Sequence, residues 1–149
     1  MTISIEILQG TLINSVDAWY KLYHEVGMDN VYVTVDTGTF YTTIKPKMPV
    51  AEAIEKLGEH INCVHVKDEV GFTNIIQCQH VWYGGGFVDF REVSDTLKKI
   101  GYKGYCSVEW EGWENGGLAG VGDPGGIGLT DFDMVAQEAK LFLEEEGFC

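Results

Sequence analysis

Basic residues are scarce in this sequence of 149 residues. Lysine and arginine together number 10, against 23 aspartates and glutamates, and the formal net charge at pH 7 is −13. Nucleic acids and anionic membrane surfaces repel so acidic a protein, so neither is an expected partner. Much of the acidic charge falls on predicted helix faces, where it favours solubility.

Long apolar runs and paired cysteines are also missing. No segment approaches the roughly 20 apolar residues that a membrane-spanning helix needs, and no signal-peptide pattern opens the chain. The four cysteines (Cys63, Cys78, Cys106 and Cys149) show no CxxC spacing. Reduced thiols in a cytoplasmic protein are therefore expected. Without a linker or low-complexity segment, residues 1–149 are expected to form one domain, or one piece of a larger one.

What the sequence does contain is an alternation of short apolar strands and amphipathic helices, which is typical of α/β architecture. Strands are expected at 1–8, 31–35, 61–66 and 105–109. Cap and stop signals predict four helices, which begin after Asn14, at Pro49, after Asp89 and near Asp131; the first three end near Gly27, Gly58 and Gly101. The pattern amounts to four strand–helix units.

The last of these strands carries a carboxylate among apolar residues. Residues 105–111 read YCSVEWE, and Glu109 lies inside the apolar pattern. Burying an unpaired ion costs several kcal/mol. A neighbouring group must therefore compensate Glu109.

The other strands repeat this feature. Because side chains alternate between the two faces of a strand, each strand sorts into an aliphatic face and a second face. On the second face, a small residue is followed two positions later by a potential metal ligand: Ser4 and Glu6, Thr34 and Asp36, Cys63 and His65, Ser107 and Glu109. All four potential ligands fall near the C-terminal ends of their strands, where (β/α) barrels build their active sites.

Three carboxylates and one imidazole are a suitable ligand set for a divalent cation. Mn²⁺ is the first expectation, with Mg²⁺, Co²⁺ and Zn²⁺ as alternatives. Such an ion would also compensate Glu109 and lower the pKa of its carboxyl group. Taken singly, each residue has another interpretation: His65 as a core histidine, Asp36 as the start of an Asx turn, and Glu6 as the partner of a lysine.

The same stretches resemble the sugar phosphate isomerase/epimerase superfamily, the xylose isomerase-like TIM barrels that include ketose 3-epimerases and inosose dehydratases. ISIEILQGTLINSVDAW, VYVTVDTGTFY, INCVHVKDE and GGGFVDFREVSDTLKKIGYKGYCSVEWE are similar to the regions of the fifth to eighth strands. The resemblance covers nearly the whole chain but only the second half of the barrel. It implies that Glu6, Asp36, His65 and Glu109 are the metal ligands.

The resemblance also implies a mechanism. In the epimerases the metal holds adjacent oxygens of a ketose and stabilises an enediolate, while two glutamates exchange a proton on opposite faces. Glu6 and Glu109 would fill these catalytic roles. Lys67 and Asp68, which follow the histidine as in the family, and the aromatic Trp110 are expected to bind substrate.

Two departures from the family pattern put simple epimerisation in doubt. Epimerases usually have a histidine three residues after the aspartate, where this chain has Thr39, and the arginine expected after His65 is missing from KDEVGFTN. A lyase or dehydratase that acts on a sugar, cyclitol or glycoside through the same carbon-acid chemistry therefore remains an alternative. Endonuclease IV-like DNA repair, which shares the fold, is disfavoured by the acidic charge and the lack of further histidine ligands.

Strands one to four of the barrel have no counterpart, and half a barrel would expose two sheet edges. The chain is therefore expected to form a homo-oligomer, to bind a complementary half-barrel chain, or to be a truncated product. A non-catalytic subunit or relic that keeps the ligands is a third functional alternative.

Other motifs have weaker interpretations. Residues 120–125 spell GxGxxG, but this segment lies past its strand and contains a proline, so a dinucleotide site is rejected. The region 112–130 is expected to form a lid or a disordered loop. Residues 77–87 carry aromatic side chains that could stack on a sugar or simply pack. Lys45 and Lys47 are expected to be solvated, with a phosphate contact as the alternative.

Overall fold

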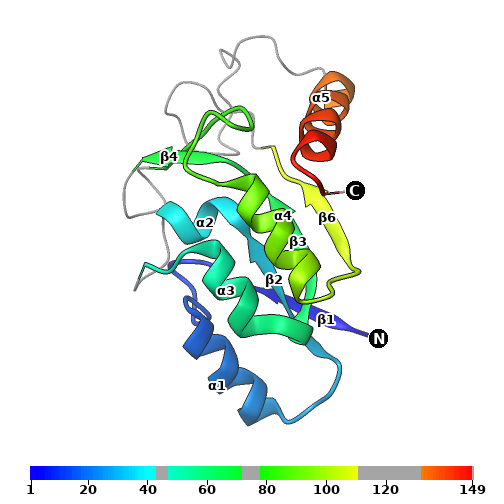
Figure 1. Cartoon of the computed structure of the whole chain (residues 1–149). Helices are drawn as coiled ribbons and strands as arrows, with labels where there is room; N and C mark the ends of the chain where they lie inside the picture. The colour runs from blue at the N-terminus through cyan, green and yellow to red at the C-terminus, as the bar shows by residue number, and fades with distance from the viewer. Residues whose placement is uncertain (43–46, 72–77, 111–131, 149) are drawn as a thin grey trace.

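A parallel sheet forms the centre of the computed structural model, which describes residues 1–42, 47–71, 78–110 and 132–148. Its strands are β1 (Ile3–Glu6), β2 (Val31–Asp36), β3 (Ile61–Val66) and β6 (Tyr105–Val108), in the order β1-β2-β3-β6 (Figure 1). Each strand therefore pairs with the next strand of the barrel repeat, as a (β/α) barrel requires. The predicted α/β class and the half-barrel architecture are confirmed.

The register of the sheet sets the potential ligands side by side. Glu6 pairs with Thr34, two residues before the end of β2. Asp36 pairs directly with His65, after a register shift between Val33 and Thr34. His65 in turn lies opposite Ser107, two residues before Glu109. Four ligand-type side chains thus meet at the C-terminal ends of neighbouring strands.

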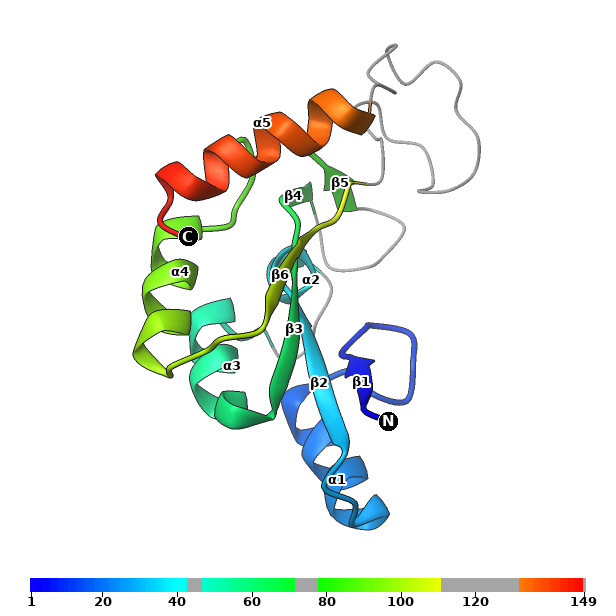
Figure 2. The ribbon, with the colours of Figure 1, turned by 90° about the vertical axis from the view of Figure 1, so that its right-hand side faces the viewer.

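Helices cover the aliphatic face of the sheet. They are α1 (Val16–Val26), α3 (Val50–Leu57), the short 3₁₀ helix η1 (Gly58–His60), α4 (Phe90–Lys99) and α5 (Phe132–Glu145). Valines of β2 and β3 form one hydrophobic core with Trp19, Ile54, Val93 and Ala139 of four of these helices. With the sheet seen edge-on, α3 and α4 lie on the same side of it (Figure 2).

The helix boundaries follow local capping chemistry. The expectation that Asn14 caps α1 is wrong by one residue, because Oγ of Ser15 accepts the N–H of Ala18 at 3.1 Å. Gly27 ends α1 in the left-handed conformation, at φ 61°, as predicted. Asp89 caps α4 through the N–H of Glu92, also as predicted.

Three short elements were not predicted from the hydrophobic pattern of the sequence. α2 (Thr37–Thr42) follows β2 without a break, and β4 (Glu69–Gly71) pairs antiparallel with β5 (Cys78–His80). A helix of six residues and strands of three residues are too short to show a hydrophobic period. The expectations for 112–130, including the GxGxxG segment, and for Lys45 fall outside the described residues, whereas Lys47 is exposed as expected.

The second face of the sheet has no helix layer among the described residues. Ser4 and Ser107 are exposed on this face, and Tyr105 is 83% exposed. In a closed barrel the same face would line the interior. None of the helices described here has the length and apolar character needed to cross a membrane.

Candidate metal centre

Four ligand-type side chains converge at the C-terminal end of the sheet. One ligand atom from each of Glu6, Asp36, His65 and Glu109 lies within 4.8 Å of the other three. They come from β1, β2, β3 and the residue after β6, so every strand of the sheet contributes one. The structure brings together all four residues that the sequence pattern selected.

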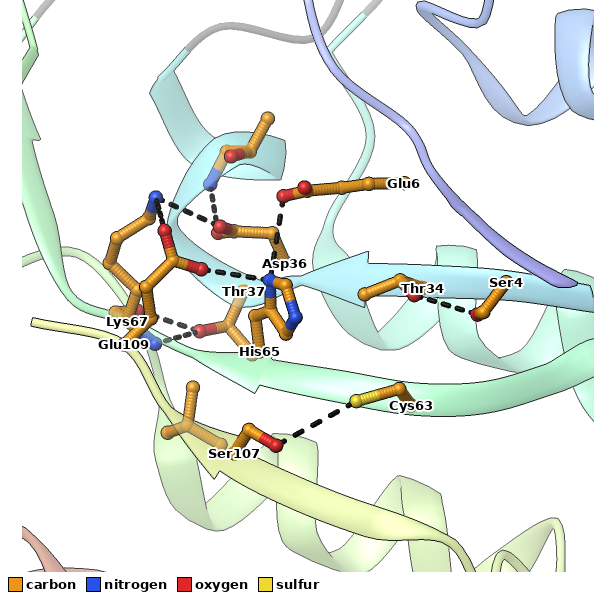
Figure 3. Close-up of polar contacts among 12 residues, drawn as sticks. Ser4, Glu6, Thr34, Asp36, Thr37, Cys63, His65, Lys67, Ser107 and Glu109 are labelled. Atoms are coloured by element: carbon orange, nitrogen blue, oxygen red, sulfur yellow. Dashed lines mark hydrogen bonds and ion pairs between the residues drawn. The ribbon is translucent and has the colours of Figure 1, made fainter.

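His65 lies between the two glutamates, as Figure 3 shows. Its Nδ1 is 2.8 Å from Oε2 of Glu109 and 3.6 Å from Oε1 of Glu6. These carboxylates, Glu109 first, raise the pKa of His65 to about 10. The same negative potential that holds a proton on the imidazole would attract a cation to it.

Asp36 is the most buried member of the cluster, with a side chain 0% exposed. Its Oδ1 accepts the N–H of Thr39 at 3.0 Å, so the Asx-type interaction weighed from the sequence occurs and begins α2. Its Oδ2 faces the cluster, 2.9 Å from Nζ of Lys67. Burial raises the pKa of Asp36 to about 6, although Lys67 opposes the shift. The two interpretations of Asp36 are therefore compatible.

Glu109 has two compensating neighbours in the protein itself. Besides His65 at Oε2, Nζ of Lys67 donates a hydrogen bond to Oε1 at 3.0 Å. His65, and then Lys67, lower the pKa of Glu109 to about 2, against the effect of burial. The sequence pattern predicted a metal ion as the compensating group, whereas Lys67, expected to bind substrate, already contacts this carboxylate.

Three buried polar atoms of the cluster are left with unmet hydrogen-bonding capacity. Oδ2 of Asp36, Nδ1 of His65 and Oε2 of Glu109 make no hydrogen bond of acceptable geometry within the described part of the chain. Each nevertheless lies within ion-pair distance of a charged neighbour. Buried orphan atoms of this kind fit a site that holds a metal ion.

A layer of small residues lies below the ligands on the same sheet face. The hydroxyl groups of Ser4 and Thr34 are 2.7 Å apart, and Sγ of Cys63 is 3.8 Å from Oγ of Ser107 (Figure 3). These short side chains keep the second face clear up to the ligand layer. This explains why each potential ligand is preceded, two positions earlier, by a small residue.

Asp68 has surroundings that differ from those of a substrate-binding residue. Its carboxylate accepts backbone N–H groups from Glu69, Gly84, Gly86 and Val88 at 2.9 to 3.2 Å, and the residue is 1% exposed. With four backbone N–H donors, this carboxylate stabilises the turn before α4. Substrate binding by Asp68 stays a prediction that its contacts do not support.

The aromatic side chains near the site divide into two groups. Trp110 follows Glu109 and meets Trp82 edge to face, with ring centroids 5.3 Å apart, and both are half-buried. Tyr83 is 4% exposed, and its hydroxyl donates to the carbonyls of Val66 and Glu109. The packing interpretation therefore holds for Tyr83. A stacking role for Trp110 remains a prediction.

Two residues support the site in ways that the sequence pattern did not predict, although Lys67 was expected to bind substrate. Lys67 lies against the ligand carboxylates, and Tyr83 ties the ends of β3 and β6 together through Val66 and Glu109. Lys67 stands directly after β3, so its position alone offered a hint. The contacts of Tyr83 depend on the path of the loop before α4, which no periodicity encodes.

Comparisons with known proteins agree with this architecture. A family model described as xylose isomerase-like TIM barrel matches residues 1–123. A protein of Histophilus somni named inosose dehydratase is 28% identical in an alignment of 102 residues that covers 60% of this chain and 34% of that protein. The chain spans about a third of the length of the curated relatives that it matches.

Solved structures share this fold over about half of their own length. D-psicose 3-epimerase from Clostridium cellulolyticum H10, determined with D-tagatose, superposes with a TM-score of 0.73 at 22% identity over 98% of this chain and 49% of that one. The IOLI protein, determined with a bound zinc atom, gives a TM-score of 0.67 at 22% identity over 97% and 48%. At these identities the likeness concerns the fold.

Proposed function

Because this chain belongs to the family of xylose isomerase-like TIM barrels, we propose that it supplies the metal-binding half of a divalent-metal-dependent sugar isomerase or epimerase. The observation that carries this proposal is the convergence of Glu6, Asp36, His65 and Glu109 within 4.8 Å. The name of the similar D-psicose 3-epimerase supports a small carbohydrate as substrate.

The cluster is proposed to hold the metal ion through three carboxylate oxygens and Nδ1 of His65. This donor set suits Mn²⁺ first, and also Mg²⁺, Co²⁺ or Zn²⁺; the zinc atom in the similar IOLI protein supports the last of these. When bound, the ion would polarise a substrate carbonyl and stabilise negative charge on its oxygen. The orphan atoms of Asp36, His65 and Glu109 support this assignment.

Glu6 and Glu109 are proposed as the acid–base pair. They come from the first and last strands of the sheet, and His65 lies between them. One carboxylate would remove the proton from the carbon next to the carbonyl, which gives an enediolate. The other would return a proton to the opposite face of that carbon. Epimerisation requires two such groups on opposite sides of the substrate.

Dehydration of a sugar or cyclitol is the second candidate function. Thr39, which replaces the usual epimerase histidine, is 2% exposed, and its N–H is bonded to Asp36. The relative from Histophilus somni is named inosose dehydratase. In this reaction the first proton abstraction is the same, but a hydroxyl group then leaves as water with a proton from the second glutamate. Trp110 and Trp82 are proposed to contact the sugar ring in either case.

A complementary half-barrel is proposed as the protein partner. β1 and β6 are the edge strands of the described sheet, and closure of a barrel would pair both. Two copies of this chain could also close a barrel, but that arrangement would place six ligand carboxylates at one mouth and combine two net charges of −13. A distinct half-barrel avoids this repulsion. A cytoplasmic location remains a prediction from the cysteine pattern.

Native mass spectrometry of the purified chain tests assembly and metal content together. The proposal expects about one divalent ion per chain, which loss of His65 would abolish. Two copies per particle would favour the homo-oligomer over the distinct half-barrel. A metal-free chain in the presence of excess Mn²⁺, Co²⁺ and Zn²⁺ would contradict the metal function and favour the non-catalytic alternative.

The reaction is tested with ketohexoses and inososes in D₂O, using the chain with whatever half-barrel copurifies. Epimerisation places one deuterium on the inverted carbon, whereas dehydration releases water and gives an unsaturated or deoxygenated ketone. Glu6→Gln and Glu109→Gln are each expected to lower turnover by about 10²- to 10⁴-fold. The exposed Glu25→Gln serves as a matched control that should retain activity.

A further inference from the structure

Lys67 places a buried ammonium group against the carboxylates of the cluster. Its side chain is 8% exposed, and Nζ lies 2.9 Å from Oδ2 of Asp36, 3.0 Å from Oε1 of Glu109 and 3.8 Å from Oε1 of Glu69. A buried ammonium is tolerated only with charged partners. Here two of those partners are proposed metal ligands.

The backbone of Lys67 is fixed as firmly as its side chain. Oγ1 of Thr37 accepts the N–H of Lys67 at 3.0 Å and donates to its carbonyl oxygen at 2.6 Å. Thr37 is 0% exposed and begins α2 directly after Asp36. This reciprocal pair links the end of β3 to the end of β2. The ammonium therefore has a defined position relative to both strands.

Lys67 and His65 contact opposite oxygens of Glu109. Lys67 binds Oε1, while Oε2 remains directed at Nδ1 of His65 (Figure 3). Lys67 thereby restricts Glu109 to presenting a single oxygen to the centre. Asp36 is restricted in a similar way, by the N–H of Thr39 at one oxygen and by Lys67 at the other.

Lys67 also changes the total charge of the cluster. The ligand carboxylates of Glu6, Asp36 and Glu109 carry −3 together when ionised, and the ammonium reduces this to −2 with His65 neutral. A divalent cation then brings these five side chains to neutrality, while the carboxylate of Glu69 adds one further negative charge 3.8 Å from Nζ. Without Lys67, the imidazole of His65 would be the one remaining cationic group among these residues to offset three closely spaced carboxylates.

We propose that Lys67 is a positioning residue and permanent counter-ion of the metal centre. It holds Asp36 and Glu109 in the ligand arrangement before the ion arrives, and it sets the cluster charge that a divalent ion neutralises. The proposal rests on the proposed function of the cluster as a metal site. It differs from a role in substrate binding, because it predicts an effect in the absence of any substrate.

Thermal unfolding of the full-length chain tests this proposal, with and without Mn²⁺. Lys67→Met keeps the apolar stem but removes the charge, and in chelator it is expected to lower Tm by about 10 °C. Saturating Mn²⁺ should recover more than half of that loss, because the ion replaces the missing charge. Lys67→Arg should lose less than about half as much as Lys67→Met. Lys56→Met, which removes a half-exposed partner of Glu52, is the control and should change little.

The outcomes separate this inference from the proposed function. If the wild type binds Mn²⁺ but Lys67→Met loses the same Tm with and without the ion, Lys67 has only a packing role and the inference fails alone. If the wild type binds no divalent ion, both proposals fail. Where Lys67→Met does not fold in chelator, recovery of its circular dichroism on refolding with Mn²⁺ supports the inference, and continued unfolding contradicts it.

Discussion

Nδ1 of His65 lies 2.8 Å from Oε2 of Glu109, across the neighbouring strands β3 and β6. The contact joins the imidazole to the carboxylate whose burial was the first anomaly of the sequence. It also brings the proposed nitrogen ligand and a proposed catalytic group to the same point.

Loss of His65 should abolish tight metal binding. His65→Ala removes the nitrogen ligand and leaves the carboxylates of Glu6 and Glu109 without their shared neighbour. We expect the affinity for Mn²⁺ or Zn²⁺ to fall by more than about 100-fold, as measured by isothermal titration calorimetry. The exposed His24 provides the control, since His24→Ala leaves the cluster intact. Equal affinities in the two variants would refute the ligand assignment.

Metal affinity should rise with pH. Without metal, the carboxylates raise the pKa of His65 to about 10, so the imidazole must lose a proton before it can coordinate an ion. Between about pH 6 and pH 8, the Kd for Mn²⁺ should fall by about tenfold per pH unit. Calorimetry in buffers of different ionisation enthalpy should detect about one proton released per ion bound. A pH-independent Kd would show that His65 is not a ligand.

Stability of the metal-free chain should fall on the alkaline side. The pKa of His65 is raised from 6.5 to about 10 in the fold, so its contribution is complete below about pH 6.5 and is lost as pH approaches 10. The pKa of Glu109 is lowered to about 2, so its contribution is present above its ordinary pKa and disappears as pH falls through 2. Urea unfolding in chelator at about pH 7 and pH 9.5 measures the alkaline arm.

The variant His65→Asn should flatten this alkaline dependence. Asp36, whose pKa is raised to about 6, finishes its titration below the chosen window and does not interfere. A wild type and a His65→Asn variant with the same pH slope would contradict the assignment of the raised pKa to His65.

Tyr83 should stabilise the fold through its hydroxyl group. Tyr83→Phe keeps the ring in the core but leaves the carbonyls of Val66 and Glu109 without this donor. We expect the free energy of unfolding to fall by about 2 kcal/mol. Tyr105→Phe alters a side chain that is 83% exposed and should change stability little. If the two variants are equally stable in urea, the Tyr83 contacts contribute nothing measurable.

The position of the Asp68 carboxylate should depend on the absence of a side chain at Gly86. A Cβ atom at Gly86 would lie 2.1 Å from Oδ1 of Asp68, so Gly86→Ala should displace the carboxylate and destabilise the turn before α4. Asp68→Asn places an amide group where backbone N–H groups donate, and should cost about 2 kcal/mol. The exposed Asp29→Asn is the control. Amide hydrogen exchange at Gly84 and Val88 reports the loosening directly, and unchanged exchange would disprove it.

Residue patterns in the sequence predict the fold class and the four side chains that converge in the structure. Strand periodicity of two placed Glu6, Asp36, His65 and Glu109 on one face at the C-terminal ends of parallel strands, and backbone geometry then required them to converge. Capping chemistry likewise located α4 at Asp89 and the end of α1 at Gly27. These features depend on neighbours a few residues apart, so local patterns encode them.

The charge balance of the site depends on tertiary contacts that the sequence pattern does not predict. The ammonium of Lys67 reaches Asp36 on β2 and Glu109 after β6 only because the sheet sets these strands on either side of β3. Tyr83 reaches Glu109 from the loop before α4, where the N–H groups of Gly84, Gly86 and Val88 bind the carboxylate of Asp68. Such contacts join distant segments through non-periodic loops, and their energies depend on burial that no local pattern records.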